Sequence, residues 1–443
     1  MPLGSRLLAA LTALGLLGEP GRAEEPNSAP AKPTAAAELP DDLPNGLLLA
    51  LAQFEVSPEG KVLPKPGPAR LDILLRRGGA WQVETIEDPA SNVFHKAMVF
   101  TPPGAAPGIL TLGGSAAALK LWRRGAAGFA AETLWQADFG GKFSRLRDAE
   151  AADLYGDGFA SLALATHDQG VVATARPKTG GEYAVRELDR RKDTFVHEIE
   201  VGDLDGDGVA EVYATPSEPN RFDGTPQPGQ VVRYVPRSGQ GPTVVADLGT
   251  RHAKEILVAD LDGDDRDELY VSVESESTTA PIEIRRYDAG TPADQGRAVA
   301  TIDDRLCRFL SAGDLDGDGR AELVAAGYKS GLWLLRPSRE AERPWTVESI
   351  DRDSSGFEHA SLVTDLDGDG TAELYVASDD QGVVRRYVWN GAALDRSTIF
   401  ERKVPRSVLT WNIMPVPAEL LRAGAPPPAP DPVHRSPQAA PRR

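Results

Sequence analysis

Asp314-Leu-Asp-Gly-Asp-Gly-Arg-Ala-Glu322 is the stretch that decides the fold, because it returns along the chain almost letter for letter. Near-identical copies begin at Asp203 and Asp365, a close variant begins at Asp260, and a degraded copy begins at Asp153. The successive spacings are 50, 57, 54 and 51 residues. Repetition at this period predicts one supersecondary unit per repeat, with neighbouring units stacked to bury a shared core.

Each repeat has the pattern of four short strands. A β-patterned stretch precedes the acidic loop, as at residues 197–202, and a second strand follows the loop directly, as at 211–215. A turn containing glycine leads to a third strand, such as 230–235, and a fourth closes the unit, such as 345–350. No segment shows a sustained helical period. Four antiparallel strands in each repeat predict the blade of an all-β propeller.

The number of blades follows from extending the alignment toward both ends of the chain. Residues 93–112 form a repeat that has lost its loop acids, and upstream of it only later strands are visible, at 47–54, 71–75 and 81–86. The missing first strand is found at the far end, at 407–414. We therefore predict a seven-bladed β-propeller of four-stranded antiparallel blades, closed by the C-terminal strand. Six or eight blades would result if one end were misaligned.

The composition supports a globular core and argues against two classes of partner. Hydrophobic residues make up 41% of the 443 residues, and the formal net charge is −18. An acidic surface disfavours nucleic acid and anionic membranes, because both attract basic proteins. The single cysteine, Cys307, permits no intramolecular disulfide, so stability must come from packing and from bound ions.

The N-terminal residues 1–23 have the features of a secretory signal peptide. Arg6 supplies the positive charge, an apolar stretch follows at 7–18, and small residues precede a cleavage site after Ala23. The apolar stretch is too short to span a bilayer, so we expect no membrane insertion of the mature chain. These features predict a secreted or periplasmic protein.

Two segments outside the repeats are predicted to be disordered. Residues 24–42 are a Pro/Ala-rich linker and residues 421–443 are a Pro/Ala/Arg-rich tail, and neither can bury enough apolar surface to fold. The predicted propeller therefore occupies residues 43–420.

The acidic loop has the donor pattern of a calcium site. Asp at positions 1, 3 and 5 supplies carboxylate ligands to one point, and glycine near position 6 permits the positive φ of a tight turn. An EF-hand would also need a Glu at position 12 and flanking helices. Here the acid stands at position 9, the flanks have strand patterns, and position 12 is Ala214, Val271, Ala325 or Val376. The loop is therefore not an EF-hand.

At these residues the sequence resembles the FG-GAP/VCBS repeat family, the calcium-binding propellers related to the integrin α-subunit head. The resemblance covers about residues 92–402 and implies a seven-bladed propeller with ions on the loop between the first and second strands of a blade. It implies about four Ca²⁺ ions as cofactors. The metal ligands that it implies are Asp203, Asp205, Asp207 and Glu211; Asp260, Asp262, Asp264 and Glu268; Asp314, Asp316, Asp318 and Glu322; and Asp365, Asp367, Asp369 and Glu373.

Three loops depart from the family pattern. In the third blade a fifth ion would depend on Asp153 and Asp157, because Tyr155 and Ser161 replace two acids. Asp265 replaces the glycine of its loop, a conformation that Asp tolerates better than most residues. The second blade has prolines in place of the acids, and we expect no ion there. Solvated acidic turns without calcium are the plainer alternative, disfavoured because four clustered carboxylates repel one another.

A second pattern is a basic residue six positions before each loop start. In a propeller the first strand of each blade lines the central channel, so these residues predict a ring around the channel mouth opposite the acidic loops. Its members are His95, Arg147, His197, Lys254, Arg308, His359 and Arg406.

Three interpretations of the ring remain open. It is a structural feature of the strand start, a binding site for an anion or carboxylate such as an acidic sugar, or a catalytic centre. The catalytic interpretation uses His95, His197 and His359 as ligands of a transition metal or as acid–base groups. We take the ring as a candidate ligand-binding site.

The function that these features predict is an exported, calcium-stabilised binding or scaffold protein. Its partner would be a glycan, an anionic small molecule or an extracellular protein. The alternative is a metal- or His-dependent sugar-active enzyme of the lyase or dehydratase type that uses the channel mouth. The sequence has no Gly-x-Ser-x-Gly elbow, P-loop, His-Glu-x-x-His or dinucleotide fingerprint. Fold alone does not decide between binding and catalysis.

Overall fold

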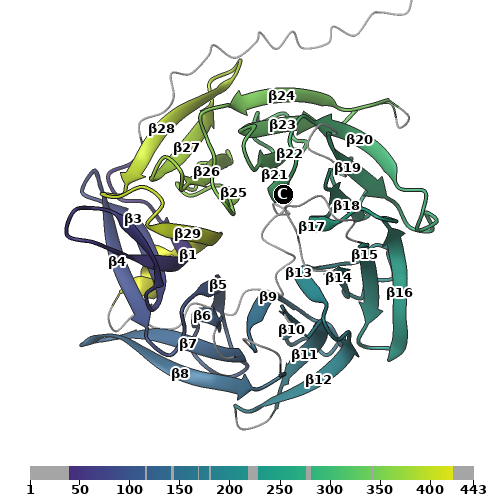
Figure 1. Ribbon diagram of the computed structural model, residues 1–443, viewed down its shortest axis with the longest axis horizontal. Coiled ribbons are helices and arrows are strands. Elements are labelled where there is room, and N and C mark those ends of the chain that lie inside the picture. The colour runs from purple at the N-terminus through teal and green to yellow at the C-terminus, as the bar shows by residue number, and fades with distance from the viewer. Residues whose placement is uncertain are drawn as a thin grey trace, which may run out of the picture.

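The computed structural model describes residues 39–422 except for 115–116, 141–143, 168, 179–180, 218–227, 276–280, 339 and 341–342. Seven antiparallel sheets stand in a ring around one axis (Figure 1), which confirms the predicted seven-bladed propeller. The predicted signal peptide and most of the two Pro/Ala-rich segments lie outside the described residues.

Blades 2 to 7 each contain four strands that are consecutive in sequence and run in order from the axis to the rim (Figure 1). Blades 2, 3 and 4 consist of β5 (Phe94–Phe100), β6 (Gly108–Gly113), β7 (Ala117–Gly125) and β8 (Gly128–Ala137); β9 (Leu146–Ala152), β10 (Ser161–Thr166), β11 (Val171–Pro177) and β12 (Tyr183–Arg190); and β13 (Phe195–Gly202), β14 (Glu211–Ser217), β15 (Gln230–Val235) and β16 (Gln240–Asp247). Blades 5, 6 and 7 consist of β17 (Ala253–Ala259), β18 (Glu268–Val273), β19 (Ile282–Tyr287) and β20 (Arg297–Ile302); β21 (Cys307–Gly313), β22 (Glu322–Gly327), β23 (Leu332–Arg336) and β24 (Thr346–Asp351); and β25 (Ser361–Thr364), β26 (Glu373–Ser378), β27 (Val383–Trp389) and β28 (Leu394–Glu401).

Blade 1 is built from both ends of the described part of the chain. Its inner strand is β29 (Val408–Pro417), which pairs antiparallel with β1 (Asn45–Val56), and β3 (Ala69–Arg77) and β4 (Ala80–Asp88) complete the blade. The ring is therefore closed by the C-terminal strand, as predicted. The sequence pattern did not predict β2 (Val62–Pro66), which forms a short hairpin with the end of β1.

The described residues, 39–422, extend slightly past the predicted propeller boundaries of 43 and 420 at both ends. A short 3₁₀ helix, η1 (Ala418–Leu421), follows β29. At the other end, Arg76 donates a hydrogen bond of 2.9 Å to the carbonyl of Pro40, and the N–H of Gly78 donates one of 2.8 Å to Asp42. The end of the predicted linker is therefore packed against β3. No helix in the described part of the chain is long and apolar enough to cross a membrane.

The hydrophobic core lies between neighbouring blades. Each of seven apolar clusters combines residues from two adjacent sheets, which is why an isolated repeat could not bury its apolar faces. Between blades 5 and 6, for example, Tyr270 packs against Trp345 with ring centroids 5.4 Å apart. Cys307 is fully buried in the same cluster, and burial raises the pKa of its thiol to about 12. The only cysteine is therefore an unreactive core residue.

Candidate functional sites: acidic loops and a basic channel mouth

The acidic loops join the first and second strands of blades 4 to 7, and each loop turns around its first Asp. In blade 5, Asp260 accepts hydrogen bonds from the backbone N–H groups of Gly263 (2.6 Å), Asp264 (3.2 Å) and Asp265 (3.0 Å). Asp265 has a φ of 69°, so it adopts the left-handed conformation that glycine has at this position in the other loops. The first aspartates of the other loops bond to backbone N–H groups in the same way.

The Glu at position 9 begins the second strand and is buried beneath the loop. Glu268 accepts hydrogen bonds from the backbone N–H of Leu261 (3.4 Å) and from the hydroxyl of Tyr270 (2.8 Å). Burial raises the pKa of Glu268 to about 8, although the nearby Arg286 guanidinium lowers it. Burial likewise raises the pKa of Glu322 to about 7. For both glutamates, the nearby positive charge therefore does not fully offset the cost of burying the carboxylate as an anion.

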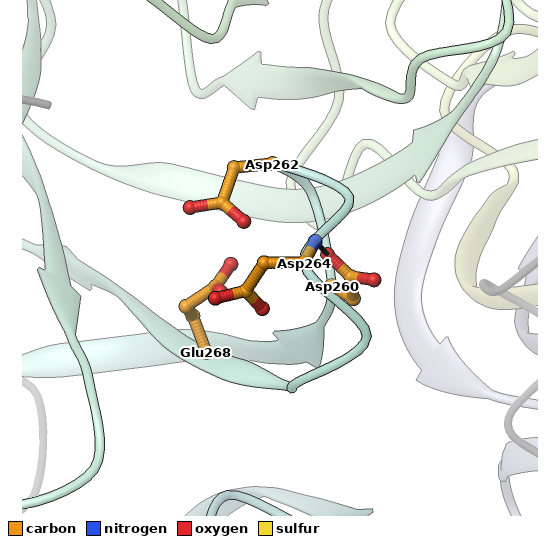
Figure 2. A group of neighbouring side chains, drawn as sticks. All are labelled: Asp260, Asp262, Asp264 and Glu268. Carbon is orange, nitrogen blue, oxygen red and sulfur yellow. Dashed lines mark hydrogen bonds between the residues drawn. The ribbon is translucent and has the colours of Figure 1, made fainter. Parts of the chain in front are cut away.

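The carboxylates of each loop converge on one point. Figure 2 shows the four acidic side chains of blade 5 grouped around one turn of the chain. In each of four groups, one oxygen per residue lies within 4.8 Å of the others: Asp260, Asp262, Asp264 and Glu268; Asp203, Asp205 and Asp207; Asp314, Asp316 and Glu322; and Asp365, Asp367 and Asp369. Ligands about 2.3–2.6 Å from one ion can be that far apart, so these donor sets fit Ca²⁺.

An arginine from the third strand also reaches each of these loops. It pairs with the same two acids in every case, at positions 3 and 9. The pairs are Arg233 on β15 with Asp205 and Glu211; Arg286 on β19 with Asp262 (2.7 Å) and Glu268 (3.3 Å); Arg336 on β23 with Asp316 and Glu322 (2.9 Å for the latter); and Arg386 on β27 with Asp367 (3.6 Å) and Glu373 (2.5 Å). The guanidinium supplies a built-in counter-charge beside the candidate ion site.

Sequence reasoning missed these arginines because their distance from the loop varies from blade to blade. In three of the four blades, however, the arginine directly precedes a tyrosine, as in Arg286-Tyr287. A second missed group is the tyrosine two residues after the position-9 Glu, which donates to that Glu in blades 4, 5 and 7. That spacing is constant, so the tyrosine was detectable from the sequence.

The loop of blade 3 differs from the acidic loops of blades 4 to 7. Arg176 donates to Asp157 at 2.6 Å and lies over the ring of Tyr155, 4.5 Å from its centroid. The first aspartate, Asp153, accepts three backbone N–H bonds, as its counterparts do. The turn is preserved, but only two acids remain, and one of them is held by a guanidinium. This donor set fits a cation less well than those of blades 4 to 7.

The predicted basic ring coincides with an irregularity in the inner strands. In β5, β9, β13, β17 and β21 the pairing with the next strand slips at the basic position, which marks a β-bulge. A bulge re-aims a side chain without ending the strand. The residues at these bulges are His95, Arg147, His197, Lys254 and Arg308.

Three of these side chains bond to the backbone of the next blade. The Nδ1–H of His95 donates to the carbonyl of Leu146 (2.7 Å), Lys254 donates to that of Arg308 (3.1 Å), and the Nε–H of Arg308 donates to that of Phe357 (2.7 Å). All three are buried. The basic position therefore has a structural role in joining blades, as one of the three interpretations expected.

One carboxylate, Glu358, holds the cations of this mouth together. It lies 2.9 Å from Lys254, 2.9 Å from Arg308 and 3.9 Å from Arg147. Burial raises the pKa of Glu358, but the three cations outweigh it and lower this pKa to about 2. Because Arg147 is in blade 3 and Glu358 precedes the inner strand of blade 7, this cluster spans the axis of the propeller.

Two aromatic rings pack against the cations of this cluster. The Arg147 guanidinium lies 4.8 Å from the ring centroid of Trp411, and Arg308 lies 5.1 Å from that of Phe357. The two rings are 6.4 Å apart in an edge-to-face arrangement, and Phe357 is 36% exposed. We call the set Arg147, Lys254, Arg308, Phe357, Glu358 and Trp411 the basic mouth.

The remaining members of the predicted ring lie outside this cluster. His359 is buried and bonds to Ser354 (2.7 Å) and to the carbonyl of Gly327 (2.8 Å). Arg406 has an exposed side chain that pairs with Asp380 at 2.8 Å. His197 packs instead against His167 and His252, with ring centroids 5.6 and 5.0 Å away.

The structure does not bring together His95, His197 and His359, the residues of the catalytic interpretation. These three histidines have separate partners, and they form no ligand group among the described residues. They belong to blades 2, 4 and 7, so their rings contact different neighbours.

Comparisons with known proteins identify the repeat and the fold. Residues 314–376, which span the acidic loops of blades 6 and 7, match the FG-GAP-like repeat family. No curated protein matches the chain. Among solved structures, a lectin from Agrocybe aegerita described as recognising non-reducing terminal N-acetylglucosamine is similar with a TM-score of 0.52 and 14% identity, covering 87% of this chain and 97% of the lectin.

A second similar structure is the periplasmic gluconolactonase PpgL of Pseudomonas aeruginosa. Its TM-score is 0.52 at 13% identity, covering 84% of this chain and 99% of the gluconolactonase. At such identities both likenesses show the fold alone. The chain is therefore a seven-bladed β-propeller that carries an FG-GAP-like repeat at residues 314–376.

Proposed function

We propose that this protein is an exported, calcium-stabilised binding propeller, whose acidic loops hold Ca²⁺ and whose basic mouth binds an acidic glycan. The observation that supports calcium is the convergence of acidic oxygens within 4.8 Å in blades 4 to 7. Four ions would reduce the formal charge from −18 to −10. Each ion would join the end of an inner strand to the start of the second strand, in a chain with no disulfide.

The observation that supports binding at the basic mouth is a pair of donors without acceptors. In the described part of the chain, neither the Nε–H of Arg147 nor the indole N–H of Trp411 has a hydrogen-bond partner, although both are buried. An unmet buried donor costs about 1–3 kcal/mol, so an incoming oxygen would be favoured there. A sugar offers hydroxyl or carboxylate oxygens to donors and an apolar face to the rings of Trp411 and Phe357.

The structure also shows which variants test the proposal cleanly. Arg147 and Arg308 are buried against Glu358, so replacing them would disturb folding as well as binding. Phe357 is the better choice, because its ring is 36% exposed at the mouth. Phe159, which is 54% exposed on the acidic loop of blade 3, provides a matched control on the opposite face.

The test is a glycan array that includes uronic-acid and sialylated glycans, probed with wild type, Phe357→Ala and Phe159→Ala. We expect wild type and Phe159→Ala to bind the same acidic glycans and Phe357→Ala to lose at least about tenfold in affinity, equivalent to about 1.4 kcal/mol. Equal binding by all three proteins, or no binding to any acidic glycan, would contradict the proposed site.

A second candidate function is an enzyme acting on sugars, supported by the histidines beside the basic mouth. In the described residues, Nε2 of His197 and both ring nitrogens of His252 have no hydrogen-bond partner. Burial, with help from nearby cations, lowers the pKa of His252 to about 3, so the ring is neutral near pH 7 and its unpaired nitrogens could orient a sugar hydroxyl by hydrogen bonds. Turnover of a sugar lactone or uronic-acid glycan that His252→Asn abolishes would support this candidate, and the absence of turnover would contradict it.

A further inference from the structure

The axis of the propeller contains a second group of carboxylates, separate from the loops. A cavity of about 30 Å³ lies between the inner strands and is lined on one side by acids from blades 3, 4 and 5. These are Glu150 on β9, Glu198 and Glu200 on β13, and Glu255 on β17. Lys96 and Asn412 line the same cavity from blades 2 and 1. The volume is sufficient for an ion or a few waters but not for a sugar.

The charges along the axis do not balance. Six carboxylates face four cations: Asp148, Glu150, Glu198, Glu200, Glu255 and Glu358 against Lys96, Arg147, Lys254 and Arg308. The imbalance is two negative charges. Lys96 pairs with Asp148 and Glu150, whereas Lys254 pairs with Glu255 and Glu358. Among the described residues, no cation forms a salt bridge with Glu198 or Glu200.

Two buried acceptors in this cavity lack donors. Glu200 is 4% exposed and its Oε2 has no hydrogen-bond partner in the described part of the chain. Asn412 is 8% exposed, comes from the opposite side of the ring, and its Oδ1 is likewise without a partner. The amide oxygen is neutral, so it points to a missing donor or cation independently of the acids. Burying such groups unpaired is costly.

We propose that the axial cavity binds one divalent cation of the hard, oxygen-preferring class, best represented by Ca²⁺. Its ligands are Glu150, Glu198 and Glu200 together with the amide oxygen of Asn412. One such ion would balance the two excess negative charges and satisfy both unpaired acceptors. Carboxylate and amide oxygens are the ligands that Ca²⁺ prefers, and the residues that line the cavity include no cysteine or histidine. The one sulfur there is the thioether of Met414, which is a poor ligand for a hard cation.

The axial donors are less closely gathered than those of the loops. In the described residues, the groups whose ligand atoms all lie within 4.8 Å of one another belong to the loops. The glutamate side chains must therefore rotate toward the ion when it binds. Burial raises the pKa values of Glu150, Glu198, Glu200 and Glu255, so two bound protons are the competing way to balance the charge.

The test counts bound ions in the full chain and separates the axis from the loops. Wild type, Glu200→Gln, Asn412→Leu and the loop variant Asp262→Asn are dialysed against the same Ca²⁺ buffer at pH 7.5 and analysed by mass spectrometry of the metal. We expect Glu200→Gln and Asn412→Leu each to hold one ion fewer than wild type. Addition of Asp262→Asn to Glu200→Gln should remove a second ion, because the two sites are independent.

A crystal structure in Ba²⁺ provides a readout that needs no variant. Anomalous density between Glu150, Glu200 and Asn412 would support the axial site even if a variant failed to fold. An empty axis, with the same ion count in wild type and Asn412→Leu, would overturn it in favour of two protons. If wild type held an ion at the axis but none in its loops, the proposed function would be contradicted and the axial site supported, so the two proposals fail separately.

Discussion

The acidic loops and the axial carboxylates use the same chemical group in two different ways. Each loop gathers three or four acids within one turn and adds one arginine from its own blade, so its charge balance is local. The axial acids lie on several blades and share cations such as Lys254, which contacts both Glu255 and Glu358. Each repeat therefore encodes its own loop, whereas the charge balance of the axial acids depends on the complete ring.

Removal of the Glu358 carboxylate should reduce the stability of the protein more than the other substitutions below. Glu358→Gln leaves Arg147, Lys254 and Arg308 buried without their shared counter-charge, and should lower the free energy of unfolding by about 3–5 kcal/mol. Urea unfolding monitored by tryptophan fluorescence measures it. The matched control is Glu84→Gln, which breaks the more exposed pair with Arg124 and should cost under about 1 kcal/mol. Equal losses in both variants would show that the axial cluster is not a stability element.

The same residue predicts a pH dependence. The pKa of Glu358 is about 2 in the folded protein and near its ordinary value of 4.5 when unfolded. A depressed folded-state pKa stabilises the fold above the unfolded-state value, and this stabilisation is lost as the pH falls from about 4.5 toward 2. The stability difference between wild type and Glu358→Gln should therefore be constant above about pH 5 and shrink below it. A difference that persists unchanged at pH 3 would contradict the assignment.

A single loop should contribute less than the axis, and only when calcium is present. Asp262→Asn removes a ligand from blade 5 and should reduce the bound Ca²⁺ by one ion per chain. At Ca²⁺ a hundredfold above Kd, the lost ion corresponds to about 2.7 kcal/mol of stability. Calorimetry in Ca²⁺ and in EDTA measures the effect, and the deficit should largely disappear in EDTA. A deficit of the same size in both buffers would mean that the loop acts without an ion.

Removal of the arginine beside a loop should change the Ca²⁺ affinity of that loop only slightly. Arg286 pairs with Asp262 and Glu268 and is a positive charge beside the candidate site. Arg286→Gln should raise the Ca²⁺ affinity of blade 5 by up to about fivefold, because a partly exposed ion pair contributes about 1 kcal/mol or less. Isothermal titration in a background of Asp205→Asn, Asp316→Asn, Asp367→Asn and the axial Glu200→Gln leaves this loop as the main Ca²⁺ site. A lower affinity would instead show that the arginine positions the carboxylates for the ion.

The sequence predicted the parts of the molecule that repeat. The spacing of the acidic loops predicted seven blades and the closing role of residues 407–414, because each blade needs the same four strands. The basic position was also detectable, since it stands six residues before each loop start. What spacing could not show was its setting, namely that Glu358 neutralises three of these cations.

The rest depends on contacts between residues that no period relates. The arginines of the third strands lie at varying distances from their loops because the intervening turns differ in length. Lys96, Glu198 and Glu255 stand at one repeat position, directly after the basic residue, but the period does not show which of them meet in the axial cavity. His167 and His252 meet His197 across three blades. Only the closed ring brings such groups together.

Thermal unfolding in Ca²⁺ and in EDTA tests whether the acidic loops hold calcium that stabilises the propeller. The clustered oxygens of blades 4 to 7 predict a Tm several degrees higher in Ca²⁺, rising further with its concentration, because ions that bind only the folded chain stabilise it by mass action. Mg²⁺ at the same concentration controls for ionic strength. The same Tm in Ca²⁺, Mg²⁺ and EDTA would contradict the account.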